Sequence, residues 1–171
     1  MEPERRERLI EKREALKAKR KLESRLRSIN DITQYLNRHK IEYRIHLEHE
    51  QADKALHSDP AYTSSLNWDE IFNSKKLTYH SFTERDEIIS TVITDYLEVS
   101  DTTFVIWNDG YKPTLEIAAN LVAEHADAIA DEDSRMWVLN VEKGFCLEHR
   151  HGAYILEHCY GGYINLVYVE N

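Results

Sequence analysis

The chain has 171 residues and a formal net charge of −9, with 22 Lys or Arg against 31 Asp or Glu. This length suits one ordinary domain, which buries roughly two-thirds of the surface of its unfolded chain. No segment approaches the roughly 20 apolar residues of a membrane span, and the charged N-terminus has no apolar stretch behind it, so we expect no membrane insertion and no standard secretion signal. Cys146 and Cys159 have no metal-ligand spacing, and we expect reduced thiols and a cytoplasmic location.

The charge is distributed unevenly along the chain. Residues 1–30 hold 11 basic and 6 acidic side chains, whereas the remainder holds 11 basic and 25 acidic ones. The body therefore carries −14, which argues against nucleic acid binding by the body, because phosphate contacts need a basic surface. It favours a basic protein partner, although an acidic surface also serves solubility alone.

The first forty residues are predicted to form a charged helix, from Pro3 to about His39. Pro3 suits the first helical position, and Glu23 and Arg27 are spaced as an ion pair on one helix face. A regular apolar face is formed by Leu22, Leu26, Ile29, Ile32 and Leu36. Before Leu22 the helix surface is charged on all sides apart from Leu9, Ile10 and Leu16, so the front half is expected to project into solvent. Ser28, Asn30 and Asp31 are helix-capping residue types and mark a break.

Residues 41–171 are predicted to form a single mixed α/β domain. The alternating pattern of 41–47 predicts a strand, and residues 76–82 predict another. Residues 83–97 have helical periodicity, 104–107 are a continuous apolar run typical of a strand covered on both faces, and 113–130 are predicted to be a helix. These elements give a β-α-β-α arrangement.

The last part of the chain is predicted to be an antiparallel β-meander. Its strands are expected at 136–141, 145–149, 153–157 and 163–169, separated by glycine-rich turns. Within it, residues 147–155 are echoed by 156–164, which indicates two similar strand-turn-strand units with Gly152 and Gly161/Gly162 in their turns.

The meander histidines and one loop aspartate form the candidate ligand site. His149, His151 and His158 lie close in sequence, and neighbouring strands could bring His149 and His158 onto one face of the sheet. Asp109 lies in a loop between a predicted strand and a predicted helix, where α/β proteins bind ligands. The histidines have no zinc-type spacing, and Asn, Asp and Gly around residue 109 also suit a plain turn. We expect no metal and no cofactor.

No catalytic signature is present in the sequence. It has no glycine-rich phosphate loop, no nucleophile elbow and no H-E-x-x-H motif. Ten tyrosines and three tryptophans offer binding area at low entropic cost. A binding role is therefore favoured over an enzymatic one.

In its size, acidity, aromatic content and absence of catalytic motifs, the body resembles bacterial immunity proteins, including those of contact-dependent growth inhibition systems. The resemblance covers residues from about 41 to 171 in general character, and the basic helix is not part of it. It implies inhibition of a cognate toxin, often a basic nuclease, by direct binding.

A dense acidic run is the predicted contact for such a partner. Repulsion among its five carboxylates would be relieved by a cationic surface. Its members are Glu124, Asp127, Asp131, Glu132 and Asp133. Two alternatives remain open: an enzyme with a site joining Asp109 and the histidines, and a scaffold or RNA-associated protein that uses the helix around Arg5 to Arg27. The oligomeric state is not predicted.

Overall fold

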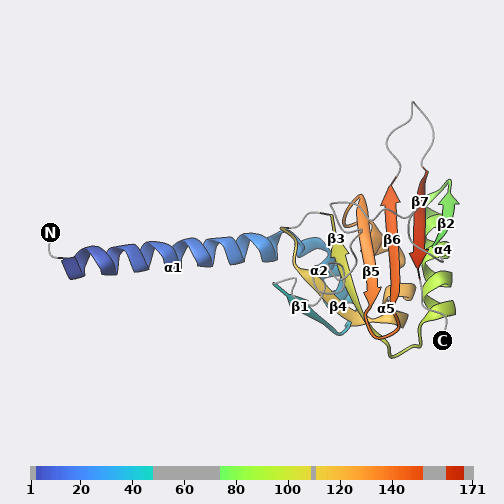
Figure 1. Ribbon diagram of the computed structural model, residues 1–171, viewed down its shortest axis with the longest axis horizontal. Helices are drawn as coiled ribbons and strands as arrows, with labels where there is room; N and C mark the ends of the chain where they lie inside the picture. The colour runs from blue at the N-terminus through green and yellow to red at the C-terminus, as the bar shows by residue number, and fades with distance from the viewer. Residues whose placement is uncertain (1–2, 48–73, 109–110, 152–160, 168–171) are drawn as a thin grey trace.

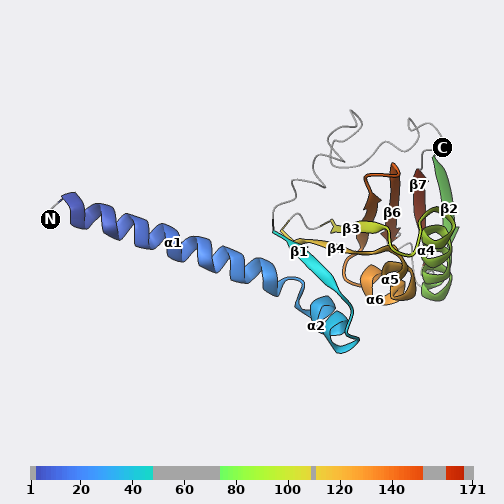
Figure 2. The same ribbon diagram turned by 90° about the horizontal axis from the view of Figure 1, so that it is seen from below.

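The computed structural model describes residues 3–47, 74–108, 111–151 and 161–167, and these form one antiparallel sheet with helices on one face (Figures 1 and 2). The strands are β1 (Tyr43–His46), β2 (Lys75–Tyr79), β3 (Thr102–Trp107), β4 (Thr114–Ala118), β5 (Arg135–Asn140), β6 (Phe145–His151) and β7 (Gly162–Val167). Their order is β1-β4-β3-β5-β6-β7-β2, and every neighbouring pair is antiparallel. The predicted mixed α/β class with a C-terminal antiparallel meander is confirmed.

The described helices are α1 (Pro3–Arg27), α2 (Asn30–Arg38), α4 (Phe82–Tyr96), α5 (Ala119–Glu124) and α6 (Ala126–Ala130). The start of α4 is fixed by side-chain caps: Ser81 Oγ accepts from the Glu84 backbone N–H at 3.1 Å, and the Glu84 carboxylate accepts from the His80 N–H at 2.7 Å. None of the described helices combines the length and apolar character that a membrane crossing requires.

Helix α1 extends away from the body in both views (Figures 1 and 2). The helix break predicted near Ser28 is confirmed, because α1 ends at Arg27 and α2 begins at Asn30. The prediction that the core-facing stripe starts at Leu22 is wrong. Leu22 and Leu26 are 40% and 39% exposed, whereas Ile29 is fully buried. Burial begins only after the break because α1 leaves the body there.

Tyr111 fixes the direction in which α1 leaves. Arg25 Nε donates to the Tyr111 carbonyl at 2.9 Å, and the Tyr111 hydroxyl donates to the Lys21 carbonyl at 3.4 Å. These two bonds hold the last two turns of α1 beside the connection between β3 and β4.

The predicted helix at 113–130 is wrong in its first part. Residues Thr114–Ala118 form β4, a strand paired with both β1 and β3, and helix begins only at Ala119. Leu115, Glu116 and Ala118 are good helix formers, but Leu115 and Ile117 on one face pack into the core while β1 and β3 supply backbone partners on both sides. Sheet packing thus overrides local preference. The helical remainder is interrupted at His125, between α5 and α6.

A row of apolar side chains crosses the sheet beneath the helices. The register places Leu115, Val105, Val138, Leu147 and Leu166 side by side on β4, β3, β5, β6 and β7. All five are at most 1% exposed. This row, with Ile29 and Leu36 of the α2 region, forms the core that holds the helical layer against the sheet.

Gly162 is required by packing rather than by a turn. A Cβ atom there would overlap the Tyr79 ring and the Arg150 carbonyl. Gly162 was expected in a turn, but it is the first residue of β7, and among the glycines of the described chain positive φ occurs at Gly144 alone. Tyr79 lies across β7 at this point and reaches His149 on β6.

Candidate functional site

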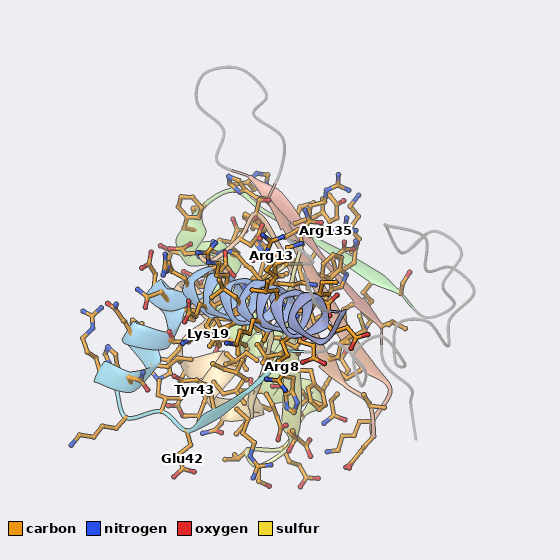
Figure 3. The ribbon with its side chains drawn as sticks, turned by 90° about the vertical axis from the view of Figure 1, so that its left-hand side faces the viewer. Arg8, Arg13, Lys19, Glu42, Tyr43 and Arg135 are labelled. Carbon is orange, nitrogen blue, oxygen red and sulfur yellow. The ribbon has the colours of Figure 1, made fainter. Side chains whose placement is uncertain are left out.

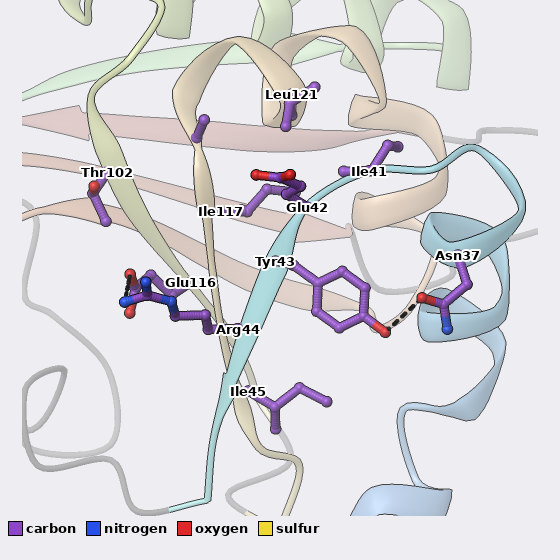
Figure 4. Close-up of a pocket in the computed structure, with 11 residues that line it drawn as sticks. Asn37, Ile41, Glu42, Tyr43, Arg44, Ile45, Thr102, Glu116, Ile117 and Leu121 are labelled. Carbon is purple, nitrogen blue, oxygen red and sulfur yellow. Dashed lines mark hydrogen bonds and ion pairs between the residues drawn. The ribbon is translucent and has the colours of Figure 1, made fainter.

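An open groove lies at the edge of the sheet, between α2, the strands β1 and β4, and the start of α5 (Figure 4). Its volume is about 910 Å³. The lining residues are Asn37, Ile41, Glu42, Tyr43, Arg44, Ile45, Thr102, Glu116, Ile117, Ala118 and Leu121. Every one of these comes from the first 121 residues, so the meander does not contribute.

One side of the groove is apolar and aromatic. Tyr43 pairs in register with Ile117, and both lie on the helix-covered face with Ile45. The Tyr43 hydroxyl donates to Asn37 Oδ1 of α2 at 3.2 Å, which orients the ring (Figure 4). Half-buried Tyr43 and Leu121 give this side the kind of amphipathic contact area that protein interfaces favour.

The other side of the groove carries a charged cluster on the opposite face of β1. Glu116 Oε2 lies 2.5 Å from His46 Nε2, and Glu116 Oε1 lies 3.7 Å from Arg44 Nη1. The His46 ring is edge-on to Phe104 at 5.9 Å between centroids. Glu116 is therefore already partnered within the chain, whereas Glu42 is exposed at the rim and forms no ion pair with a described residue.

Strand β1 is an edge strand. It pairs with β4 on one side, and no described residue pairs with its other side. Alternate backbone N–H and C=O groups of Tyr43–His46 thus point outward, next to the groove. An exposed strand edge of this kind is a template for an added strand.

The acidic run predicted from the sequence lies in and after the helices α5 and α6. Three of its five carboxylates have cationic partners within the chain. Arg85 Nη1 lies 2.8 Å from Asp131, and Lys112 Nζ lies 2.9 Å from Glu132 and 3.5 Å from Asp133. For Asp131, Glu132 and Asp133, cations of the same chain thus relieve the repulsion among the carboxylates. The sequence had led us to expect that a cationic partner would do so.

Glu124 and Asp127 differ from the other three. Both are exposed, and neither forms an ion pair with any residue that the structure describes. Glu124 lies one turn beyond Leu121 on the same face of α5, so the groove continues toward the unpaired carboxylates. Burial raises the pKa of Asp86, and the charges of Asp131 and Asp127 raise it further, which shows how closely the carboxylates of α4 and α6 gather.

His149 and His151, the two meander histidines that the structure describes, lie in a buried polar cluster away from the groove. His149 is 1% exposed, and its Nε2 lies 2.9 Å from the Tyr79 hydroxyl. Burial, followed by the nearby Arg85 charge, lowers the pKa of His149 to about 3. His151 stacks on Phe82 with ring centroids 5.7 Å apart. Both Nδ1 atoms are buried without a hydrogen-bond partner in the structure.

The candidate ligand site predicted around Asp109 is only partly described. Asp109 and His158 lie outside the described residues, as do Gly152, the predicted strand at 153–157 and the rest of 152–160. The connection that contains Asp109 joins two antiparallel neighbours, β3 and β4, and not a strand to a helix. The topological argument for a ligand site there therefore no longer applies.

Two charged clusters were missed by sequence reasoning. Arg85 is 2% exposed and forms two ion pairs. Its Nη2 lies 2.6 Å from Asp86 Oδ1, and its Nη1 lies 2.8 Å from Asp131 Oδ1, so it connects α4 to the end of α6. Arg135 and Glu148 form a buried pair at 2.5 Å on the other face of the sheet. An Arg in the helical pattern of residues 83–97 and a Glu in a predicted strand were visible in the sequence, but neither their burial nor the pairing of Arg85 with the distant Asp131 was.

No family model matches the chain, and no curated protein matches it. Within the described ranges, no three His, Cys, Asp or Glu side chains are grouped so as to hold a metal ion.

Proposed function

We propose that this chain is a cytoplasmic binding protein that neutralises a basic protein partner, in the manner of an immunity protein that inhibits a toxin domain. The partner would contact the helical surface around Glu124 and Asp127 and the adjoining groove beside β1.

One observation carries this proposal: the helical half of the body is acidic and its cations are already used. Residues 81–134 hold thirteen Asp or Glu and two Lys or Arg, a net charge of −11. The two cations are Arg85 and Lys112, and both are paired internally with carboxylates of the same segment. Glu98 and Asp101 are partnered by Lys143, and Glu116 is partnered by Arg44. The exposed carboxylates of Glu124 and Asp127 have no ion pair to a described residue, so an incoming cation meets unneutralised charge there, which gives fast electrostatically steered association.

The groove beside β1 adds apolar contact area and backbone hydrogen-bonding groups to the charge of the helical surface. Tyr43, Ile45 and Leu121 offer apolar area for anchoring side chains, and the open edge of β1 offers backbone hydrogen bonds. A partner that presents a basic surface next to an extended segment would satisfy both features.

The test begins with capture of the partner by the tagged full-length chain from its source cells, followed by stopped-flow association kinetics. The captured protein is expected to be basic, and the chain is expected to suppress its activity. Glu124→Lys and Asp127→Lys should together slow association about tenfold at about 0.1 M salt, and the deficit should shrink at about 1 M, where the Debye length falls from about 10 Å to about 3 Å.

Glu142→Lys provides the control. Glu142 is exposed in the turn between β5 and β6, and its reversal changes net charge by two, as does each test substitution. Glu142→Lys is therefore compared with Glu124→Lys alone and with Asp127→Lys alone, and equal slowing in all three would show that only the overall charge matters. An acidic partner, or a partner whose activity is unaffected by the chain, would refute the proposed function.

A further inference from the structure

Helix α1 is a long, exposed arm with no packing partner among the described residues beyond its last two turns. It has 25 residues, which gives a length of about 37 Å at 1.5 Å per residue. Leu9, Ile10 and Leu16 are 46–50% exposed. A helix without tertiary contacts is marginal in water, and the exposed pair Lys19–Glu23, at 3.9 Å, adds only a few tenths of a kcal/mol.

The arm carries the charge that the helical layer lacks. Residues 3–27 hold 11 Lys or Arg and 5 Glu, a net charge of +6, and residues 15–27 alone hold six basic side chains and one acidic one. Figure 3 looks along the arm and shows charged side chains, among them Arg8, Arg13 and Lys19, extending from it. In its second half the arm also exposes an apolar stripe with helical spacing, formed by Ala15, Ala18, Leu22 and Leu26.

The acidic helical layer of the same molecule is out of reach of this arm. The bonds of Arg25 and Lys21 to Tyr111 fix its last turns, and the arm points away from α4, α5 and α6 (Figures 1 and 2). Pairing of two arms with each other is disfavoured, because each carries +6 and the apolar residues do not repeat every 3.5 positions. Nucleic acid is disfavoured by the acidic body attached to the arm.

We infer that α1 of one molecule docks on the acidic helical layer of a second copy, with Lys17 and Arg20 facing the region of Glu124 and Asp127. The surface of α4, α5 and α6 exposes four carboxylates without an ion pair to any described residue: Glu87, Asp95, Glu124 and Asp127. When the same two copies exchange arms reciprocally, both arms and both acidic layers are occupied and the assembly closes as a two-fold dimer. The arm then competes for the surface assigned above to the foreign partner, a consequence that rests on the proposed function.

The experiment is light scattering and sedimentation velocity on the purified full-length chain with no partner present. A dimer is expected at about 0.1 M salt and a monomer at about 1 M, where screening shortens the Debye length to about 3 Å. The arm variant Lys17→Glu/Arg20→Glu and the layer variant Glu124→Lys/Asp127→Lys should each weaken the dimer at least about tenfold. Circular dichroism at about 1 M salt, where the arm of the native chain is undocked as well, should show the same helix content in both chains, since a glutamate at 17 lies one turn before Lys21. Glu142→Lys should leave the dimer intact.

Mixing the two variants gives the sharpest outcome. The acidic arm of Lys17→Glu/Arg20→Glu is complementary to the basic layer of Glu124→Lys/Asp127→Lys. The unchanged basic arm of the layer variant is complementary to the unchanged acidic layer of the arm variant. A heterodimer should therefore form although neither variant dimerises alone. A monomer at all concentrations, a dimer insensitive to these reversals, or no heterodimer on mixing would each overturn the inference. So would an arm that binds an RNA duplex while the chain itself stays monomeric.

Partner kinetics separate this inference from the proposed function. If both hold, the arm variant binds the captured partner faster than the native chain, because its acidic layer is unoccupied. If only self-association fails, Glu124→Lys still slows partner binding while the arm variant leaves it unchanged. If only the proposed function fails, the dimer and its charge-swap rescue remain.

Discussion

His149 is a histidine that the fold keeps neutral. It lies on β6 under the helical layer, is 1% exposed, and is surrounded by the Tyr79 hydroxyl, the Arg85 guanidinium and His151. The Tyr79 hydroxyl donates to the Arg150 carbonyl at 3.3 Å, so the neutral imidazole is best arranged with a proton on Nε2 that it donates to Tyr79. The Nδ1 atom is then a bare acceptor, and a proton added there would be a buried charge beside Arg85.

This arrangement predicts loss of stability in acid. The pKa of His149 is about 3 in the folded chain, below the ordinary 6.5, because burial and the charge of Arg85 disfavour the imidazolium. Between pH 6.5 and 3 the unfolded chain binds this proton and the folded chain does not, so the free energy of unfolding falls as pH falls. At 1.36 kcal/mol per pKa unit the loss reaches at most about 5 kcal/mol. Urea titrations of the native chain and of His149→Gln across this range should show a shallower pH dependence in the variant.

Tyr79→Phe is the matched control for this experiment. It removes the hydroxyl and costs about 1 kcal/mol at every pH, but His149 stays buried and the pH slope remains. Equal slopes in the native chain and in His149→Gln would mean that His149 titrates normally and that its burial is less complete than the structure gives.

At the level of elements, periodicity identified the strands and helices whose sequence and environment agree. Sequence pattern alone was sufficient to predict three elements: β1 from the alternation around Tyr43, α4 from its helical periodicity, and β3 from its continuous apolar run. Strand β4 was missed because Leu115, Glu116 and Ala118 read locally as helix, and only pairing with β1 and β3 makes them a strand. The groove could not be predicted, because it needs Asn37, Tyr43 and Leu121 to meet across 84 residues of chain. The acidic run was found, but its internal partners Arg85 and Lys112 required the tertiary structure.

The exposure of α1 predicts that its front part is dispensable for folding. Deletion of residues 1–20 keeps Lys21, Arg25 and the contacts with Tyr111, and removes side chains that are exposed wherever they are described. Calorimetry at about 1 M salt, where self-association is screened, should give the same melting temperature for the truncated and native chains. Leu36→Ala, in a fully buried position of α2, should cost about 2–5 kcal/mol in comparison. A truncated chain that melts as early as Leu36→Ala would show that the arm packs on its own body.

The molecule as a whole separates its charge, with a basic arm at one end and an acidic helical layer on the body (Figure 1). This separation, and not the net charge of −9, sets how the molecule meets other proteins. The arm has few contacts within its own chain to keep it helical, so its helical order should depend on docking to a second copy. Stability should therefore be distributed unevenly, lowest in the arm and highest in the central strands.

Hydrogen exchange detected by mass spectrometry tests this distribution. Amides of the buried central strands β3, β5 and β6 should exchange only through global unfolding, because their side chains and both backbone edges are covered. Amides of α1 should exchange rapidly at about 1 M salt, where a lone helix opens readily, and residues 15–27 should become protected at about 0.1 M salt as the arm docks on a second copy. In Glu124→Lys/Asp127→Lys that salt-dependent protection should disappear while exchange in β5 is unchanged. Equal protection of α1 in both salts and in the variant would show that the helix is held by contacts within its own chain, and the separated charges would then have no part in ordering it.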